Sequence, residues 1–277
     1  MRNYSPGGFK ILPPVVKNLL IINGLFFLAT LTFKSAFQID LYHVFGLHMP
    51  FSQNFSPYQF VTYMFMHGDF THLLFNMFAL WMFGNVLENV WGTKRFIAYY
   101  FITGFGAAIL HYGIIYYQML PTLNMLNEFL SAPDPETLKA FIESDNFKII
   151  SKTNFKHFLN SYNELINSNP SEAMSLAVNY MSQYKVDFMN LPVVVGASGA
   201  VFGILLAFGV MFPNTLIYVF FAIPVKAKYF VMIYGGLELY FGLTSHGNIA
   251  HFAHLGGMLF GLLVLWYWKK RRGNFYS

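Results

Sequence analysis

The sequence predicts an all-α, polytopic membrane protein with six membrane-spanning helices. Three observations lead to this class. Of the 277 residues, 56% are hydrophobic and only 10% are charged, whereas soluble domains carry about 25% charged residues. The mean hydropathy is +0.45. The apolar residues also gather in runs close to the roughly 20 residues that cross the hydrocarbon core of a bilayer. Together these features exclude a disordered chain, a coiled coil and an ordinary cytosolic enzyme.

Six apolar runs define the expected helices. They lie at about residues 18–33, 71–87, 96–117, 193–212, 229–243 and 249–268. The first run lacks a good small-residue cleavage site, so we interpret it as a retained helix rather than a signal peptide. The shorter apolar piece Leu216–Ile223 lies between two prolines. It is too short to span a membrane and is interpreted as an interfacial connector.

The basic residues predict the orientation. An even number of spans puts both termini on one side, and that side collects eleven of the 17 basic residues and no acidic residue. The positive-inside rule therefore predicts cytoplasmic termini. No transit-type leader is visible, which favours the plasma (inner) membrane. Because the bases flank apolar runs, we expect the lipid bilayer as a partner and no nucleic acid. Cysteine is absent, which excludes disulfides and Cys-based zinc sites.

Composition divides the chain into three segments. Residues 1–117 hold the first three spans, residues 118–191 form an insert, and residues 192–277 hold the last three spans. The insert carries eight of the 12 acidic residues and no long apolar run, so we expect it on the extracytoplasmic side. Its apolar residues recur with helical period, and Asn169-Pro170-Ser171-Glu172 is typical of a helix start. Either a small helical spacer or a substrate gate fits this pattern.

The second span opens with polar residues that are costly inside a membrane. Asp69 is the expected N-cap, which places His67 in the entry turn and His72 one turn into the helix. His72 and Asn76 are four residues apart and share a helix face. One interpretation is hydrogen bonding between helices, and the other is chemistry at the end of the helix.

Two helix faces rich in small residues each carry one reactive side chain. The faces consist of Gly196, Gly199 and Gly203 in the fourth span and of Ala250, Gly257 and Gly261 in the sixth. Small residues allow two helices to approach closely, which would bring Ser198 beside His254 as a nucleophile and its base. The topology puts His72 at the same extracytoplasmic level.

No carboxylate has an obvious place beside this pair. Asp69 is assigned as a cap, Glu88 lies near the cytoplasmic end of its helix, and Glu238 lies in the fifth span at another level. The sequence therefore predicts a dyad in which packing, rather than an acid, orients His254. Phe202, one turn below Ser198, could stack on the imidazole.

A metal site is the competing interpretation of the histidines. It would use His67, His72, His251 and His254. No His-Glu-x-x-His pattern is present, and no carboxylate adjoins these residues as a base. We therefore expect no metal and no cofactor.

The motifs together resemble the rhomboid family of intramembrane serine proteases. They are His72-x-x-x-Asn76, Gly196-x-Ser198-Gly199 and Ala253-His254-x-Gly256-Gly257, on the second, fourth and sixth spans. The resemblance implies a six-helix rhomboid-like bundle with Ser198 as nucleophile and His254 as general base. It also implies an oxyanion site formed by His72, Asn76 and the backbone N–H of Ser198, with structural roles for His67 and Glu88. The long insert departs from the family pattern.

The implied function is cleavage of transmembrane or membrane-adjacent segments of membrane protein substrates. Two other classes remain open. A rhomboid-like protein could bind membrane clients without cutting them. A transporter or channel would place its polar residues near the midplane and often carries an inverted repeat, and neither feature is visible. The sequence does not define the substrate or the oligomeric state.

Overall fold

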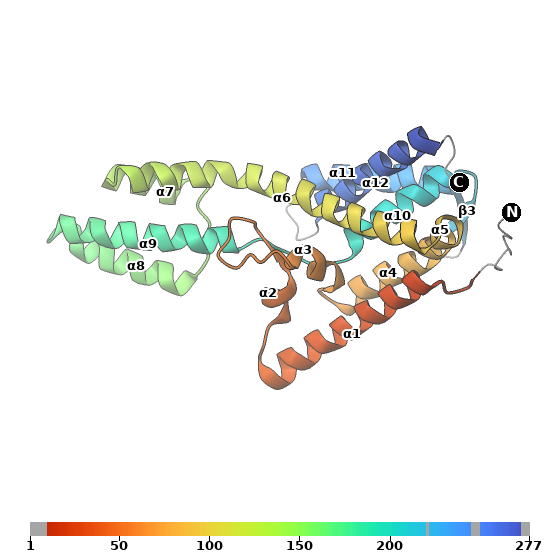
Figure 1. Ribbon diagram of the computed structural model, residues 1–277. Coiled ribbons are helices and arrows are strands. Elements are labelled where there is room, and N and C mark those ends of the chain that lie inside the picture. Colours follow the sequence, from red (N-terminus) through yellow and green to blue (C-terminus); the bar gives the residue numbers. More distant parts are fainter. Residues whose placement is uncertain (1–9, 220–221, 245–249, 273–277) are drawn as a thin grey trace. The chain divides into compact units, whose positions relative to one another are not determined.

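A computed structural model describes residues 10–219, 222–244 and 250–272. The chain divides into two compact units. Unit 1 comprises residues 1–47, 57–112 and 194–277, and unit 2 comprises residues 48–56 and 113–193. Helices dominate the described residues (Figure 1), so the predicted all-α class is confirmed.

Unit 1 is a helical bundle. Its elements are α1 (Pro14–Phe37), α2 (Leu41–Phe45), α3 (Gln59–Thr62), a 3-10 turn (Tyr63–Phe65), α4 (Phe70–Ala79), a π-helical turn (Leu80–Gly84), α5 (Asn85–Trp91), the first part of α6 (Thr93–Ser131), α10 (Ser198–Met211), β3 (Leu216–Val219), β4 (Ile223–Lys226), α11 (Ala227–Thr244) and α12 (His251–Arg272). Helices α10, α11 and α12 pack against one another (Figure 1).

Four helices of the described chain are long and apolar enough to cross a membrane. They are Pro14–Phe37, Phe70–Trp91, Thr93–Ser131 and His251–Arg271. Helix α10 is apolar but has only 14 residues, because the preceding residues 193–197 are not helical. The membrane class is therefore confirmed, and the count of six spans stays a prediction.

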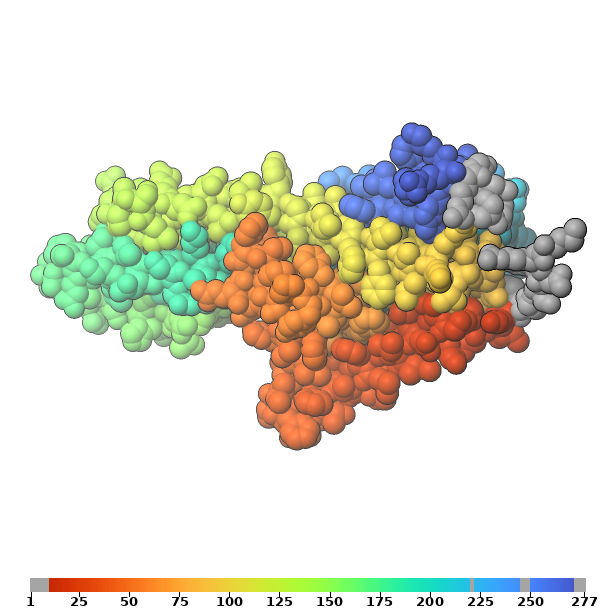
Figure 2. Space-filling view, in the orientation of Figure 1, coloured from red at the N-terminus to blue at the C-terminus, as the bar shows by residue number. Residues whose placement is uncertain are grey.

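The outer surface of unit 1 is apolar. Leu25 and Leu28 of α1 and Trp266 of α12 are each about three-fifths exposed. Figure 2 shows both helices on the surface of this unit, α1 in red and α12 in dark blue. Water would penalise such a surface, whereas hydrocarbon chains accommodate it without cost. These faces fit contact with lipid.

A buried glutamate stabilises the start of α1. The carboxylate of Glu88 accepts hydrogen bonds from the backbone N–H groups of Val15 (3.0 Å) and Val16 (2.8 Å) and from the hydroxyl of Thr93 (3.1 Å). The first N–H groups of a helix have no partner within it, and the helix dipole favours negative charge there. This contact fits the structural role that we expected for Glu88.

The expected connector after α10 contains a small hairpin. Strands β3 and β4 pair antiparallel, with Leu216 opposite Lys226 and Val219 opposite Ile223. The sequence indicated a piece too short to span but did not predict strands. Pro224 is tolerated here because the ribbon has two strands within the described residues, so each strand is an edge strand.

Unit 2 is helical throughout most of its length. It contains the end of α6, α7 (Pro135–Glu143), α8 (Lys152–Leu165) and α9 (Pro170–Asn190), and the two-residue strands β1 (Leu47–His48) and β2 (Val193–Val194) lie at the borders of the units. The predicted start of α9 is confirmed, because Asn169 accepts from the N–H of Glu172 at 3.3 Å. Helices α8 and α9 pack together, with Phe158 and Tyr180 stacked at 4.2 Å.

Helix α6 is longer than the expected third span. It runs for 39 residues and continues through Pro121, so the predicted segment boundary at residues 117/118 lies inside a helix. A proline removes one backbone hydrogen bond and can be accommodated within a helix at a kink. A change from apolar to polar composition changes the surroundings of a helix but does not end it.

Candidate active site

The nucleophile candidate lies at the first residue of α10, immediately after a glycine turn. Gly196 has a φ of +125°, a conformation that favours glycine. A Cβ atom at Gly196 would also lie 2.8 Å from Cε1 and 2.9 Å from Nε2 of His72. Glycine is therefore needed here for its backbone and for the space it leaves to the His72 ring. The turn ends the extended chain and starts α10 at Ser198.

Ser198 and His254 are brought into direct contact, as the glycine faces predicted. The Nε2 atom of His254 lies 2.9 Å from the Oγ atom of Ser198. This distance is within the hydrogen-bond range that a nucleophile and its general base require. Both side chains are half-buried, so the pair is shielded from bulk water without being sealed from it.

The two helices approach closely because they meet at glycines. A Cβ atom at Gly257 would overlap the carbonyl oxygen of Gly199 and lie 2.7 Å from its carbonyl carbon. At Gly261 a Cβ atom would lie 3.4 Å from the Cα atom of Gly203 on α10, and it would overlap the hydroxyl of Tyr99 on α6. The prediction that the glycine faces of the fourth and sixth spans pack together is thus confirmed. This contact sets the separation between Ser198 and His254.

Phe202 holds the plane of the imidazole. Its ring stacks on His254 with centroids 4.1 Å apart and an interplanar angle of 3°, which confirms the expected stacking. Parallel rings restrict tilting of the imidazole. Stacking does not, however, determine which ring nitrogen carries the proton.

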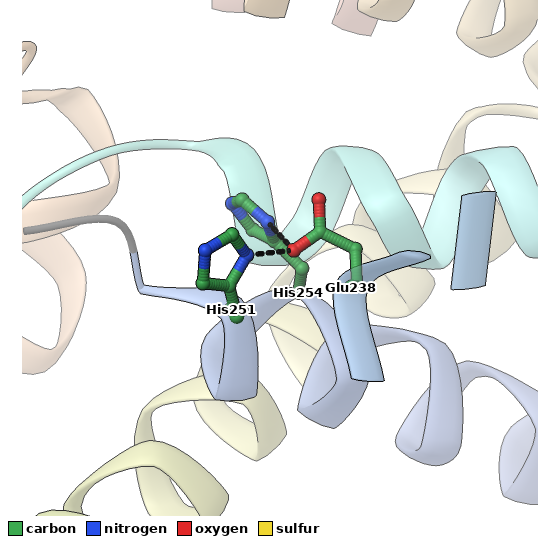
Figure 3. Close-up of side chains that lie close together, drawn as sticks. All are labelled: Glu238, His251 and His254. Carbon is green, nitrogen blue, oxygen red and sulfur yellow. Dashed lines mark hydrogen bonds and ion pairs between the residues drawn. The ribbon is translucent and has the colours of Figure 1, made fainter. Parts of the chain in front are cut away.

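The expectation that no acid adjoins His254 is wrong. The Oε2 atom of Glu238 on α11 lies 2.9 Å from Nδ1 of His254 and 2.7 Å from Nδ1 of His251. Figure 3 shows both imidazoles directed at this one oxygen. Glu238 is buried, with 6% of its surface exposed. The packing of α11 against α12 brings it to the level of His254, which its position in the fifth apolar run did not reveal.

One signal in the sequence could have identified Glu238. An ionisable side chain within an apolar helix needs a partner, and two histidines follow within 16 residues. His251 and His254 are three residues apart and face the same side of α12. A search for the partner of Glu238 would therefore have led to this pair.

The two oxyanion candidates lie on α4. Asp69 caps this helix as predicted, accepting from the N–H of His72 at 2.8 Å. The His72 ring lies against Gly196, as described above. Asn76 is buried, and its Nδ2 donor has no hydrogen-bond partner within the described residues. Leaving a buried donor without a partner is energetically costly. The unpaired Nδ2 of Asn76 therefore fits a group whose acceptor belongs to a bound molecule.

His67 packs beside His72 rather than joining a shared site with His254. The two rings lie edge to face, with centroids 5.1 Å apart. Burial, together with the neighbouring His72, lowers the pKa of His67 to about 4. His67 is therefore neutral at physiological pH and fits the structural role expected for it.

The four histidines of the competing metal interpretation do not form one ligand set. The set of potential metal donors that the described residues bring together is Glu238, His251 and His254, with donor atoms within 4.8 Å of one another. Two ligand atoms on tetrahedral zinc lie about 3.3 Å apart. The observed separations of 2.7 and 2.9 Å are shorter and match hydrogen bonds. Hydrogen bonding therefore accounts for the arrangement.

Comparison with known families identifies the chain. The model of the Rhomboid domain matches residues 54–123 and 170–271. The chain belongs to the rhomboid family. The matched ranges include Ser198, His254, His72 and Asn76 and omit most of the insert. Among curated proteins, none matches the chain.

Proposed function

We propose that this protein is an intramembrane serine endopeptidase that cleaves transmembrane or membrane-adjacent segments of membrane proteins. The observation that carries the proposal is the 2.9 Å contact between His254 Nε2 and Ser198 Oγ at the start of α10. Membership of the rhomboid family supports it. A helix bundle that only binds clients has no need of a serine and a base in this geometry.

The proposed reaction is acyl transfer. His254 takes the proton of Ser198 as Oγ attacks the carbonyl carbon of the substrate, and it then gives this proton to the leaving amine. Water then attacks the resulting ester. His254 takes a proton from this water and gives it to the Oγ atom of Ser198 as the ester breaks. The oxyanion is held by the N–H of Ser198, which is a free donor at the helix start, and by His72 and Asn76. The mechanism uses no metal and no cofactor.

A test of the function is proteolysis by the purified protein in liposomes. We expect it to cut a model transmembrane substrate and to be blocked by a fluorophosphonate probe. Mass mapping should place the adduct on Ser198. A folded protein that neither cuts nor reacts with the probe would favour the alternative, a rhomboid-like protein that binds clients.

The oxyanion proposal predicts a loss of turnover. His72→Ala and Asn76→Ala should each lower kcat, by about 10²–10³-fold for a fully effective donor, and leave KM nearly unchanged. The reason is that such donors act mainly on charge that develops in the transition state. His72 is expected to show the smaller effect where water replaces it. Steady-state kinetics and the melting temperature should be measured on the same preparations.

Asn23→Ala provides a matched control for these variants. Asn23 is also a buried asparagine in an apolar helix, but its Nδ2 donates to Leu19 of its own helix at 2.7 Å. Its replacement should leave kcat unchanged. If His72→Ala and Asn76→Ala lower the melting temperature and retain kcat, the two residues hold helices together and do not stabilise an oxyanion.

The basic residues support an orientation with both termini in the cytoplasm and the insert outside, at the plasma (inner) membrane. Ser198 then reacts at the extracytoplasmic side. Lys139 in α7 has a side chain 73% exposed, and Asn214 is exposed after α10. In intact cells an impermeant thiol reagent should label Lys139→Cys and should not label Asn214→Cys. The native chain has no cysteine, so the background is low, and the reverse pattern would invert the orientation.

A further inference from the structure

We infer that Glu238 is a positioning residue for the proposed peptidase, and that His251 holds its carboxylate in place. The inference rests on the proposed function. It adds an acid to a site in which the serine and histidine alone were expected. The four groups form one hydrogen-bonded chain from Ser198 through His254 and Glu238 to His251.

The carboxylate determines the tautomer of His254. A carboxylate oxygen only accepts hydrogen bonds, so the Nδ1 atom that lies 2.9 Å from Glu238 carries the proton. The opposite nitrogen, Nε2, then has its lone pair free and faces Ser198 Oγ. Only this tautomer can accept the proton of the serine. The stacked ring of Phe202 is indifferent to the position of the proton, so the stacking cannot replace this function.

The carboxylate also favours the charge that arises during the reaction. When the bond between Oγ and the carbonyl carbon forms, the serine proton moves to Nε2 and His254 becomes an imidazolium. Glu238 remains ionised and stabilises this cation through the Nδ1–H bond. The proton leaves with the amine product, and Ser198 stays acylated. Water then attacks the ester and gives a proton to His254 Nε2, and this proton passes to Ser198 Oγ as the acid product leaves, which restores the initial state.

His251 explains how the acid stays in position. A lone carboxylate in an apolar helix is unfavourable unless it is paired and hydrogen-bonded. His251 begins α12 and donates to Oε2 at 2.7 Å, so the same oxygen accepts from both imidazoles. In the hydrogen-bonded chain, His251 is linked to His254 and Ser198 through Glu238. It therefore acts on the reaction through Glu238.

Other titratable groups face this chain and take part in its electrostatics. They come from three helices and are His72 on α4, His111 on α6 and Tyr234 on α11. Within the chain of bonds itself, Glu238 carries the negative charge. Its removal should therefore change the pH at which the base loses its proton.

The experiment compares Glu238→Gln with Glu88→Gln. Both replace a buried, hydrogen-bonded glutamate by its neutral isostere, but Glu88 caps α1. We expect Glu238→Gln to lower kcat by about 10²–10⁴-fold, the upper value being that of a serine-protease triad that loses its acid. The rate of fluorophosphonate labelling at Ser198 should fall in parallel. Glu88→Gln should lose thermal stability and keep kcat.

The pH profile separates positioning from a merely structural role. The acidic limb of kcat/KM reports protonation of the base in the free enzyme. Without the carboxylate the imidazolium is less favoured, so in Glu238→Gln this limb should move to lower pH by about one unit or more. It should stay in place in Glu88→Gln. Glu238→Asp keeps the charge and should recover part of kcat and most of the limb position.

His251 is tested by two variants. His251→Asn retains an N–H donor near the position of Nδ1, whereas His251→Leu removes it. We expect the leucine variant to lose kcat and the asparagine variant to recover part of it. If Glu238→Gln misfolds, the two His251 variants and Glu238→Asp test the inference instead, because each of them keeps a carboxylate at position 238. The inference then requires kcat to fall in the variants in which the hydrogen bonds of this carboxylate are lost or weakened.

The outcomes distinguish this inference from the proposed function. If the unaltered protein cuts substrate and labels at Ser198, while Glu238→Gln does both at the same rate and with the same pH profile, the positioning role is wrong and the peptidase stands. If the unaltered, folded protein neither cuts nor labels, the peptidase proposal fails and the positioning role fails with it.

Discussion

Replacement of Ser198 by alanine is expected to abolish cleavage of a transmembrane substrate while leaving the fold intact. Loss of the nucleophile from a serine protease lowers kcat by about 10⁶-fold, which is below detection in a liposome assay. The side chain is half-buried and makes its hydrogen bond to His254. Losing such a bond costs about 1 kcal/mol, so the melting temperature should change little.

Ser175→Ala is a suitable control for this variant. The hydroxyl of Ser175 bonds the carbonyl of Ser171 within α9 at 3.0 Å, so its loss should affect neither turnover nor stability. Cleavage by Ser198→Ala at the rate of the unaltered protein would remove the serine mechanism altogether. Loss of cleavage together with loss of the folded state would require the comparison to be repeated with Ser198→Cys and Ser198→Thr.

The second large effect is expected from Gly257→Leu. Even the first atom of the new side chain would overlap the carbonyl of Gly199, and a backbone carbonyl cannot move aside without separating α10 from α12. Overpacking of this kind costs about 3 kcal/mol. Because Ser198 and His254 lie on the two separated helices, kcat should fall as well, and a shift of about 1 Å can cost 10²-fold.

Gly236→Leu is the matched control. Gly236 also lies in a helix of unit 1, but a Cβ atom there would meet no atom within 4 Å. We expect this variant to retain its melting temperature and its turnover. If Gly257→Leu also melted and cut normally, the close contact of α10 with α12 would not be required for the site.

Much of the site could be predicted because its signals are local. The spacing of glycines along two apolar runs indicated which faces would meet, and the structure brings Ser198 and His254 together there at 2.9 Å. Phe202 lies one helical turn from Ser198, so its stacking followed from helix geometry. The cap at Asp69 followed from residue type and position. Each of these inferences needed only the repeat of the α-helix or the known preference of one residue type for one position in a helix.

The length of α6 and the β3–β4 hairpin could not be predicted in the same way. Composition changes near residue 118, but helix hydrogen bonds continue because they depend on the backbone and not on polarity. In the connector, two prolines flank a run of apolar residues, and this run does not alternate clearly between apolar and polar residues. The hairpin there depends on pairing between two segments that are individually too short to be distinctive.

By itself, the sequence determined the membrane class, the helices that carry the candidate catalytic residues and the contact of Ser198 with His254. Only the tertiary structure decided that Glu238 reaches His254 and His251. Helix periodicity determines which residues share a face of one helix. It does not determine how α11 is rotated against α12, and the apolar residues of α11 do not define a face toward α12. That rotation results from side-chain packing between the helices, and it decides whether the carboxylate meets lipid or the two imidazoles.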